Sequence, residues 1–222
     1  ANTLSAQNFT SAINSHNTAV GFNAGSAITT GIYNTLLGSS AGDALTDADN
    51  NVAVGYLALS ADTLGSQSTA LGRSALAAQN FTSATASQNV AVGYSAGTAV
   101  TTGVNNTLIG AHAGDVLTDA DNNVAVGYQA LGADTLGSKS TAIGRFALYT
   151  QNFTSATNSN NVAVGYYAGK AVTTGVNNTL LGTAAHDNLT TGDLNISVGY
   201  SNGPSAVGVD SEIVIGNSVT GA

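Results

Sequence analysis

A five-residue pattern of polar and apolar positions recurs along the whole chain. Each copy runs from a polar residue, usually Asn, through Thr or Val, a small or apolar residue and an aliphatic residue to Gly, as in residues 51–55. Short β-branched segments that end at Gly are typical of β-strands. The twelve copies end at Gly21, Gly38, Gly55, Gly72, Gly93, Gly110, Gly127, Gly144, Gly165, Gly182, Gly199 and Gly216. We therefore expect twelve short strands, one for each copy.

The spacing of these glycines predicts the architecture. Consecutive glycines are 17 residues apart except for two steps of 21, so that four copies make a 72-residue super-repeat. The longer steps contain the phrase 79–84 and its repeat at 151–156, and the same phrase at 7–12 precedes the first copy. A period this short leaves no room for a βαβ unit, which needs about 30 residues. The spacing predicts an all-β fold, a parallel β-solenoid or β-roll of about 12 coils of 17 residues.

The solenoid is expected to form one continuous array over residues 1–222. Its coils group into super-repeats at 17–88, 89–160 and 161–210, and residues 211–222 form an altered final coil or run-out. Altered end repeats are usual where a stack is capped. Within each coil, a second phrase such as 94–100 predicts a second short strand that leads into a turn at 101–103.

Both faces of each predicted strand carry small or apolar residues. The aliphatic residue before each glycine, such as Val54, shares a face with the residue two positions earlier, and we expect this face to form the spine inside the roll. The opposite face carries residues such as Ala53, where a half-exposed strand would be polar. No predicted helix is available to cover the second face, so a further copy of the chain is expected to do so. The leading Asn residues are expected to form a hydrogen-bonded ladder at a corner of the coil.

Composition narrows the classes of function. The net charge is −8, from 12 acidic and 4 basic residues, which argues against nucleic acid as a partner. No stretch is long and apolar enough to span a bilayer, so no membrane insertion is expected in this segment. The chain has no Cys, which excludes disulfides and thiolate metal sites. Neither a Ser-His-Asp order nor paired catalytic carboxylates recur, so we expect no enzymatic activity and no cofactor.

The repeats resemble those of a known family. The phrases at 89–97 and 106–110 are similar to the head repeats of trimeric autotransporter adhesins of the YadA type, and to similar repeats in bacteriophage tail fibres. The resemblance extends from about residue 17 to residue 216. It implies a left-handed coil, a homotrimer with two further copies of the chain, and attachment to a cell-surface glycan or protein receptor. It also implies an extracellular location, on a virion tail fibre or on a bacterial cell surface.

Aromatic and basic residues that follow the glycines are candidates for glycan binding. Tyrosine rings stack well on sugars and carry a polar hydroxyl. The alternative is that the rings cover the edge of the roll or an interface between chains. The candidate residues of this column are Tyr56, Tyr94, Tyr128, Tyr166, Arg73 and Arg145.

The inserted phrases provide a second candidate. Phe81 and Phe153 lie in the two long steps, and Phe9 occupies the matching position near the start. Insertions in repeat proteins often share one face, which can be the binding face. We expect Phe81 and Phe153 to contact a receptor, with the alternative that each ring fills a gap under its own bulge.

Clustered acids are a candidate Ca²⁺ site. Asp47 and Asp49, with their repeats Asp119 and Asp121, offer carboxylate oxygens at alternate positions of one turn. The EF-hand pattern fails because Val52 stands where Gly is needed, so a solvated acidic turn is the favoured alternative. The three histidines, His16, His112 and His186, occupy different repeat positions and are interpreted as ordinary loop or surface residues, although their copies in a trimer could share an ion.

Three functions compete on these observations. The favoured one is a structural and adhesive segment of a trimeric surface fibre that attaches to a host cell, to glycans above all. The alternative is a monomeric solenoid with a flat face of the ice-binding type, although Val interrupts its Thr column in alternate coils. A polysaccharide-degrading solenoid ranks last because such enzymes need carboxylates at a defined separation.

Overall fold

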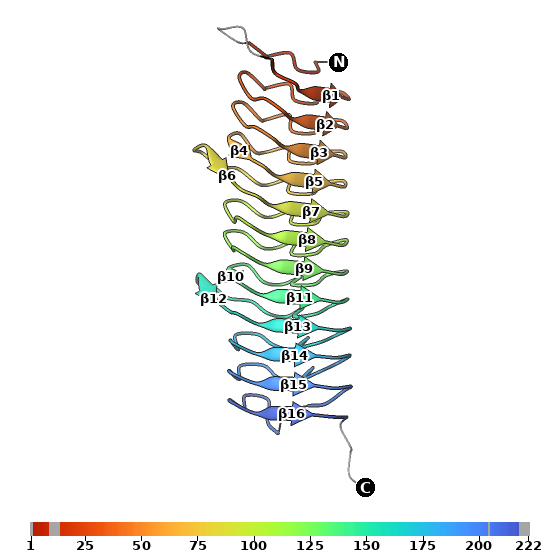
Figure 1. The fold of residues 1–222 in the computed structure, drawn as a ribbon, viewed down its shortest axis with the longest axis vertical. Coiled ribbons are helices and arrows are strands. Elements are labelled where there is room, and N and C mark those ends of the chain that lie inside the picture. The colour runs from red at the N-terminus through yellow and green to blue at the C-terminus, as the bar shows by residue number, and fades with distance from the viewer. Residues whose placement is uncertain (1, 9–13, 204, 218–222) are drawn as a thin grey trace.

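The chain forms a column of stacked coils. The computed structural model describes residues 2–8, 14–203 and 205–217, so Phe9 and the run-out beyond residue 217 lie outside the described residues. The described part contains sixteen short strands and no helix. Successive coils lie one above another from β1 to β16 (Figure 1). The prediction of an all-β parallel solenoid of about 12 coils is therefore confirmed.

Twelve strands form one parallel sheet along the column. Each pairs in register with the strand of the next coil, so that Thr35 faces Val52 and Thr69 faces Val90. The strands, in sheet order, are β1 (Thr18–Val20), β2 (Thr35–Leu37), β3 (Val52–Val54), β5 (Thr69–Leu71), β7 (Val90–Val92), β8 (Thr107–Ile109), β9 (Val124–Val126), β11 (Thr141–Ile143), β13 (Val162–Val164), β14 (Thr179–Leu181), β15 (Ile196–Val198) and β16 (Ile213–Ile215). The repeated five-residue pattern thus corresponds to the strands of this main sheet.

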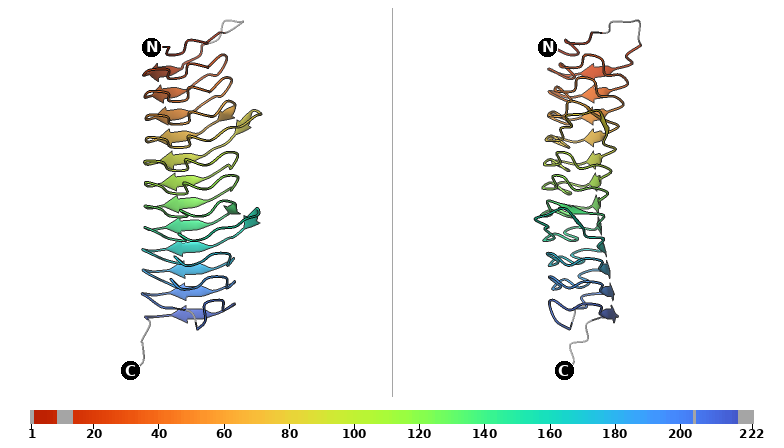
Figure 2. Two further views of the ribbon diagram at one scale, coloured as in Figure 1. Left: turned by 180° about the vertical axis from the view of Figure 1, so that it is seen from behind. Right: turned by 90° about the vertical axis from the view of Figure 1, so that its left-hand side faces the viewer.

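The two longer coils bulge outward. Strand β4 (Gly65–Ser66) pairs with β6 (Thr85–Ala86), and β10 (Gly137–Ser138) pairs with β12 (Thr157–Asn158). β6 and β12 stand out from one edge of the column (Figures 1 and 2). Because the main sheet keeps its register across both insertions, the extra residues change the outer surface and leave the stack intact.

The interior of the coil holds the middle residue of each strand. Ala53 is fully buried, whereas Leu37 and Leu71, which precede glycines, are 48% and 43% exposed. The prediction that the aliphatic residues before glycine form the inner spine is therefore wrong. Period-2 alternation shows which residues share a face, but it does not show which face is inside.

The narrow interior explains this arrangement. Most inner positions hold Ala, and a larger Leu fits where glycines leave space beside it. A Cβ at Gly25 would lie 2.7 Å from Cδ1 of Leu36, and one at Gly42 would lie 2.9 Å from its Cδ2. One Leu side chain therefore fills the room left by glycines of two coils, which gives the close packing typical of protein interiors.

The predicted second strand is a series of turns. Residues 94–99 have no strand conformation, and Ser95 and Gly97 have φ angles of +53° and +57°. These left-handed residues bend the chain, yet its backbone still bonds to the next coil, as in the 3.0 Å bond from the Gly97 N–H to the Ala113 carbonyl. The apolar pattern came from turn residues such as Ala96 and Val100, which point into the interior.

The Asn ladder is confirmed and is buried. The Oδ1 of Asn34 accepts the N–H of Asn51 at 3.0 Å, and its Nδ2 donates to the carbonyl of Ala48 at 2.7 Å. The same two bonds recur around Asn106, whose Oδ1 accepts the N–H of Asn123 and whose Nδ2 donates to the carbonyl of Ala120. Each buried amide is thus satisfied, as buried polar groups must be. The ladder ties each coil to its neighbour.

At each insertion, Gln replaces the missing Asn side chain. Ser68 stands in the Asn column, and the Nε2 of Gln79 donates to Ser68 Oγ at 2.9 Å and to buried Asp62 at 2.6 Å. The Oε1 of Gln79 accepts Nδ2 of Asn89 at 2.9 Å, which restores the ladder. Gln151 and Asp134 repeat this arrangement one super-repeat later.

Candidate functional site

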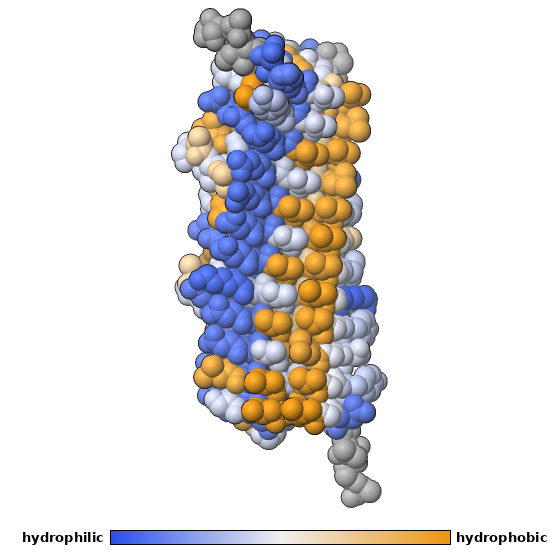
Figure 3. Space-filling model, viewed as in Figure 1, coloured by the Kyte–Doolittle hydropathy of each residue, from blue (hydrophilic) through white to orange (hydrophobic). Residues whose placement is uncertain are grey.

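The outer surface of the main sheet carries an apolar stripe. We call the residues that precede the glycines the aliphatic stripe; they are Val20, Leu37, Val54, Leu71, Val92, Ile109, Val126, Ile143, Val164, Leu181, Val198 and Ile215. Their exposure reaches 57% at Val20 and 75% at Ile215. Beside them runs a second outward column, in which Thr and Val alternate from Thr35 to Thr179 and then give way to Ile196 and Ile213. Figure 3 shows the resulting apolar band along the length of the column.

The stripe is unusual for a free surface. Monomeric proteins rarely expose contiguous apolar patches above a few hundred Å². Here the apolar side chains follow one another from β1 to β16 without a charged residue among them. Because the strands are in register, the side chains form straight rows on a sheet face. Such a face is suited to contact with another regular surface.

The predicted Tyr and Arg residues come together at the edge where the strands end. Arg73 lies between two tyrosines, with its guanidinium carbon 5.8 Å from the Tyr56 ring centre and 5.3 Å from that of Tyr94. Its Nη1 donates to the Tyr94 hydroxyl at 2.8 Å. Each ring is nearly half exposed, so these groups remain open to a ligand.

The same arrangement recurs in the second super-repeat. The Arg145 guanidinium carbon lies 5.6 Å from the centre of the Tyr128 ring and 5.7 Å from that of Tyr166. Cation–π contacts of this kind hold the long Arg side chain in place. The structure therefore places the six predicted residues in two Tyr–Arg–Tyr sandwiches.

Phe81 and Phe153 are buried, unlike the Tyr and Arg candidates. Each ring is only 6% exposed. A Cβ at Gly65 would lie 2.7 Å from the Phe81 ring, so the ring fills the space under its own bulge. The Phe81 N–H also donates to the buried Asp62 carboxylate at 3.1 Å. The rings are not accessible to a receptor here, and the accessible part of the bulge is its tip at residues 82–84.

The acidic candidates are engaged in turns. Asp47 accepts the hydroxyl of Thr30, and Asp49 accepts the N–H of Ile32 at 2.8 Å. Asp119 and Asp121 make the matching bonds in the second super-repeat, to Thr102 and Val104. In the described part of the chain, no three His, Asp or Glu residues come together as a metal site. These carboxylates hold each turn to the preceding coil.

His186 lies in a turn and is buried, so of the two expected settings, loop or surface, it has the first. It stands where Gly114 stands one super-repeat earlier, and its φ angle is +48°. Its Nε2 lies 3.7 Å from Oε2 of Glu212, and neither ring nitrogen has a hydrogen-bond partner among the described residues. Burial lowers the pKa of His186, and the Glu212 carboxylate opposes that shift. The signal in the sequence was the loss of the expected glycine.

Glu212 itself is held by the altered final coil. Its carboxylate accepts the N–H of Ser205 at 2.9 Å, which lowers the pKa of Glu212. Just before that coil, Ser197 of β15 and Asn202 form a buried polar pair, with 2.9 Å between Ser197 Oγ and Asn202 Oδ1. The C-terminal coils thus replace the regular apolar interior with polar contacts.

Comparison with known proteins adds no identity. No family model matches the chain, and neither a curated protein nor a solved structure does. Within the described residues, no helix has the length and apolarity needed to cross a membrane. The geometry of the sheet face and its edge is therefore the basis for a function.

Proposed function

We propose that this chain is a structural and adhesive segment of a trimeric surface fibre that attaches to a host cell surface, with glycans as the ligand. The observation that carries this proposal is the aliphatic stripe on the outer face of the main sheet. The fibre would belong to a phage tail or to a bacterial surface, in keeping with the resemblance to tail fibres and YadA-type adhesins. The same resemblance supports a left-handed coil.

The period of the stripe favours a copy of the same chain as its partner. A covering surface must be apolar over twelve coils and must match rows that repeat with every strand. A further copy has both properties, whereas an unrelated globular protein has neither. Three copies around a common axis would close the assembly and leave no stripe uncovered.

The energy of burial is comparable to the cost of association. Full burial of a Val, Leu or Ile side chain contributes about 1.5–3 kcal/mol, so a half-exposed one contributes about 1 kcal/mol. Nine residues of the stripe are at least 36% exposed, which gives on the order of 10 kcal/mol per chain before the second column is counted. Association costs roughly 4–15 kcal/mol for each partner. The stripe is therefore of the right size to hold chains together.

The adhesive role draws on the Tyr–Arg–Tyr sandwiches. They follow the glycines and so lie at the edge of the sheet, beside the stripe rather than within it. Half-exposed tyrosines with a fixed Arg between them offer stacking and hydrogen bonding to sugars. The stripe would assemble the fibre while the edge faces the ligand.

An ice-binding solenoid is the second candidate. The outward rows of Thr and aliphatic residues on a regular sheet are the observation that favours it. In that case the stripe would meet ice instead of another chain, and the protein would be a monomer.

Small-angle X-ray scattering distinguishes the two candidates. A trimer of parallel columns has the length of one column and a much larger cross-section. We expect the cross-sectional radius of gyration to exceed that calculated for a single column, with little change in length. A cross-section equal to that of one column, together with inhibition of ice recrystallisation, would replace the fibre with the ice-binding alternative.

A further inference from the structure

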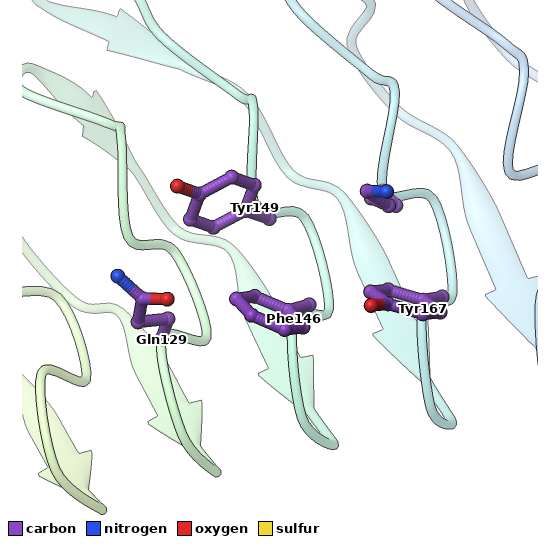
Figure 4. Close-up of a pocket in the computed structure, with 5 residues that line it drawn as sticks. Gln129, Phe146, Tyr149 and Tyr167 are labelled. Atoms are coloured by element: carbon purple, nitrogen blue, oxygen red, sulfur yellow. The ribbon is translucent and has the colours of Figure 1, made fainter.

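A small hollow opens among aromatic rings on the turns that follow β9, β11 and β13. Its volume is about 170 Å³, and it is lined by Gln129, Phe146, Tyr149, Tyr167 and Lys170. The rings of Phe146 and Tyr167 are stacked, with 5.3 Å between centroids and 9° between planes, and Tyr149 meets Phe146 edge to face at 5.0 Å. Figure 4 shows Gln129, Phe146 and Tyr167 on three successive turns, with Tyr149 across from them.

The fold does not need these large residues. One super-repeat earlier, the five positions hold Leu57, Ser74, Ala77, Ser95 and Thr98. The backbone is the same in both places: φ is +57° at Ser74 and +60° at Phe146, and +53° at Ser95 and +59° at Tyr167. Because Ser, Ala and Thr support the same turns, the fold itself does not require the rings.

The left-handed backbone belongs to the turn and not to this hollow. Bulky residues such as Leu57 and Leu131 adopt the same positive φ angles in other coils. What distinguishes the hollow is therefore the choice of aromatic residues at Phe146 and Tyr167, where Ser is sufficient upstream.

Positive charge gathers at this hollow in an acidic chain. Two of the four basic residues, Arg145 and Lys170, lie beside the rings that line it. Lys170 Nζ lies 4.5 Å from the Tyr167 ring centre, and the Arg145 guanidinium carbon lies 4.2 Å from that of Phe146. Among the described residues, no carboxylate pairs with either cation. The rings therefore hold two cations that no carboxylate of the described residues neutralises.

We propose that this hollow binds one carboxylated sugar ring, a uronic or sialic acid unit, of a surface polysaccharide. The apolar face of the sugar would stack on the rings, its carboxylate would meet Lys170 with Arg145 at the rim, and Gln129 would bond a hydroxyl. This inference rests on the proposed attachment to glycans and names its site and chemical class. It adds Phe146, Tyr149, Tyr167, Lys170 and Gln129 to the residues considered for binding.

The size of the hollow fits a single unit of a long chain. Pockets for whole small molecules are usually about 300–1,000 Å³, so 170 Å³ admits little more than one ring. Binding at one hollow is expected to be weak. Several hollows on one fibre, held at fixed spacing against a repetitive polysaccharide, would raise the overall affinity by avidity.

The upstream super-repeat supplies a matched variant. Phe146→Ser, Tyr149→Ala, Tyr167→Ser and Lys170→Thr together install the residues that already support the same turns at 74, 77, 95 and 98. The variant should therefore fold. The probes are polygalacturonate and polysialic acid, with neutral dextran as the control, in a surface-binding measurement on the full chain. We expect the native chain to bind at least one acidic polymer and the variant to lose tenfold or more in affinity.

The reverse transplant provides a gain of function. Leu57→Gln, Ser74→Phe, Ala77→Tyr, Ser95→Tyr and Thr98→Lys should create a second hollow and strengthen binding to the same polymer. The polymer that is bound identifies the source of the carboxylated sugar. Absence of binding to both acidic polymers, or equal binding to dextran, would overturn the proposal.

Solution mass separates this inference from the proposed function. If the native chain and the quadruple variant are both trimers and bind equally, the inference fails and the fibre stands. If the variant changes the mass, the rings are a contact between chains and the inference also fails. If the native chain is a monomer that still loses acidic-polymer binding in the variant, the fibre fails and the sugar site stands.

Discussion

The inner and outer columns of the main sheet are both apolar, yet they are built from different residues. The inner column is mostly Ala with Leu at intervals, whereas the outer stripe is Val, Leu and Ile throughout. Inside, the narrow coil admits small side chains beside glycines, and the larger aliphatic residues are placed outside. The comparison shows that size, more than apolarity, decides which residue is buried in this solenoid. The outer stripe therefore requires a second explanation, for which we propose contact with further copies.

The largest effect is expected from charges placed on the outer column. Ile109→Glu with Ile143→Glu puts two carboxylates into the aliphatic stripe of each chain, where the proposed interface would leave them without a partner. Unpaired buried charges cost about 3–5 kcal/mol each, so the trimer should dissociate. Sedimentation velocity measures the assembly, and circular dichroism should show the coil fold retained.

A substitution away from the stripe controls for general effects of charge. Val116→Glu changes a turn position where Asn188 stands one super-repeat later, so a polar residue is already accommodated there. This variant should keep the native sedimentation coefficient. Equal sedimentation of the native chain and the double stripe variant would contradict the role of the stripe.

A substitution in the buried Asn ladder should lower the stability of the coil and leave assembly unchanged. Asn106→Ala removes the acceptor for the Asn123 N–H and the donor to the Ala120 carbonyl, both of them buried. Each unsatisfied buried group costs about 1–3 kcal/mol, so unfolding should become easier by about 3 kcal/mol. Denaturant unfolding followed by circular dichroism measures this loss.

The neighbouring exposed residue is the control for the ladder. Asn105→Gly removes a side chain while suiting its φ angle of +59°. Its effect on stability should stay below about 0.5 kcal/mol. An equally small loss of unfolding free energy for Asn106→Ala would show that the Asn ladder contributes little to stability.

The smallest effect concerns pH at the altered end. Because burial lowers the pKa of His186 in the folded chain, the unfolded chain binds a proton first as pH falls below about 6.5. Stability is therefore fully present above that pH and decreases as pH falls through the folded pKa. Glu212, whose pKa is also lowered, adds a further loss at more acidic pH. Thermal unfolding between pH 7.5 and 5 measures the first of these effects.

His186→Gly should flatten this pH dependence, because it restores the residue found at position 114 and suits the left-handed backbone. The control is His112→Ser, which matches Ser40 upstream and should leave the dependence in place. If the unfolding temperature falls with pH equally in the native protein and in His186→Gly, the buried histidine is not the source of the pH dependence.

The repeated pattern predicted more of the stack than of the surface. Glycine spacing located all twelve strands of the main sheet, and the leading Asn residues predicted the ladder. Whether Val54 lies on the inner or the outer face of the sheet could not be predicted, because alternation shows which residues share a face but not which face is buried. The left-handed turn at Ser95 was hidden because any small residue there also suits a strand.

Candidate residues that occupy repeat positions could be predicted, whereas contacts that the folded coils create could not. The Tyr–Arg–Tyr column follows directly from repeat positions. Gln79 compensates for Ser68 across 11 residues of chain, a pairing that only the folded bulge reveals. The aromatic hollow draws on three coils, and its signal was the replacement of Ser74 by Phe146 between super-repeats. Comparing the super-repeats position by position would have found it.

Molar mass in solution tests the central claim most directly. The aliphatic stripe, as an interface between copies, predicts a particle of three times 21.8 kDa by light scattering on the purified chain. That mass should persist on dilution to low micromolar concentration. A mass of 21.8 kDa at every concentration would contradict the account, because the stripe would then be exposed in the native protein.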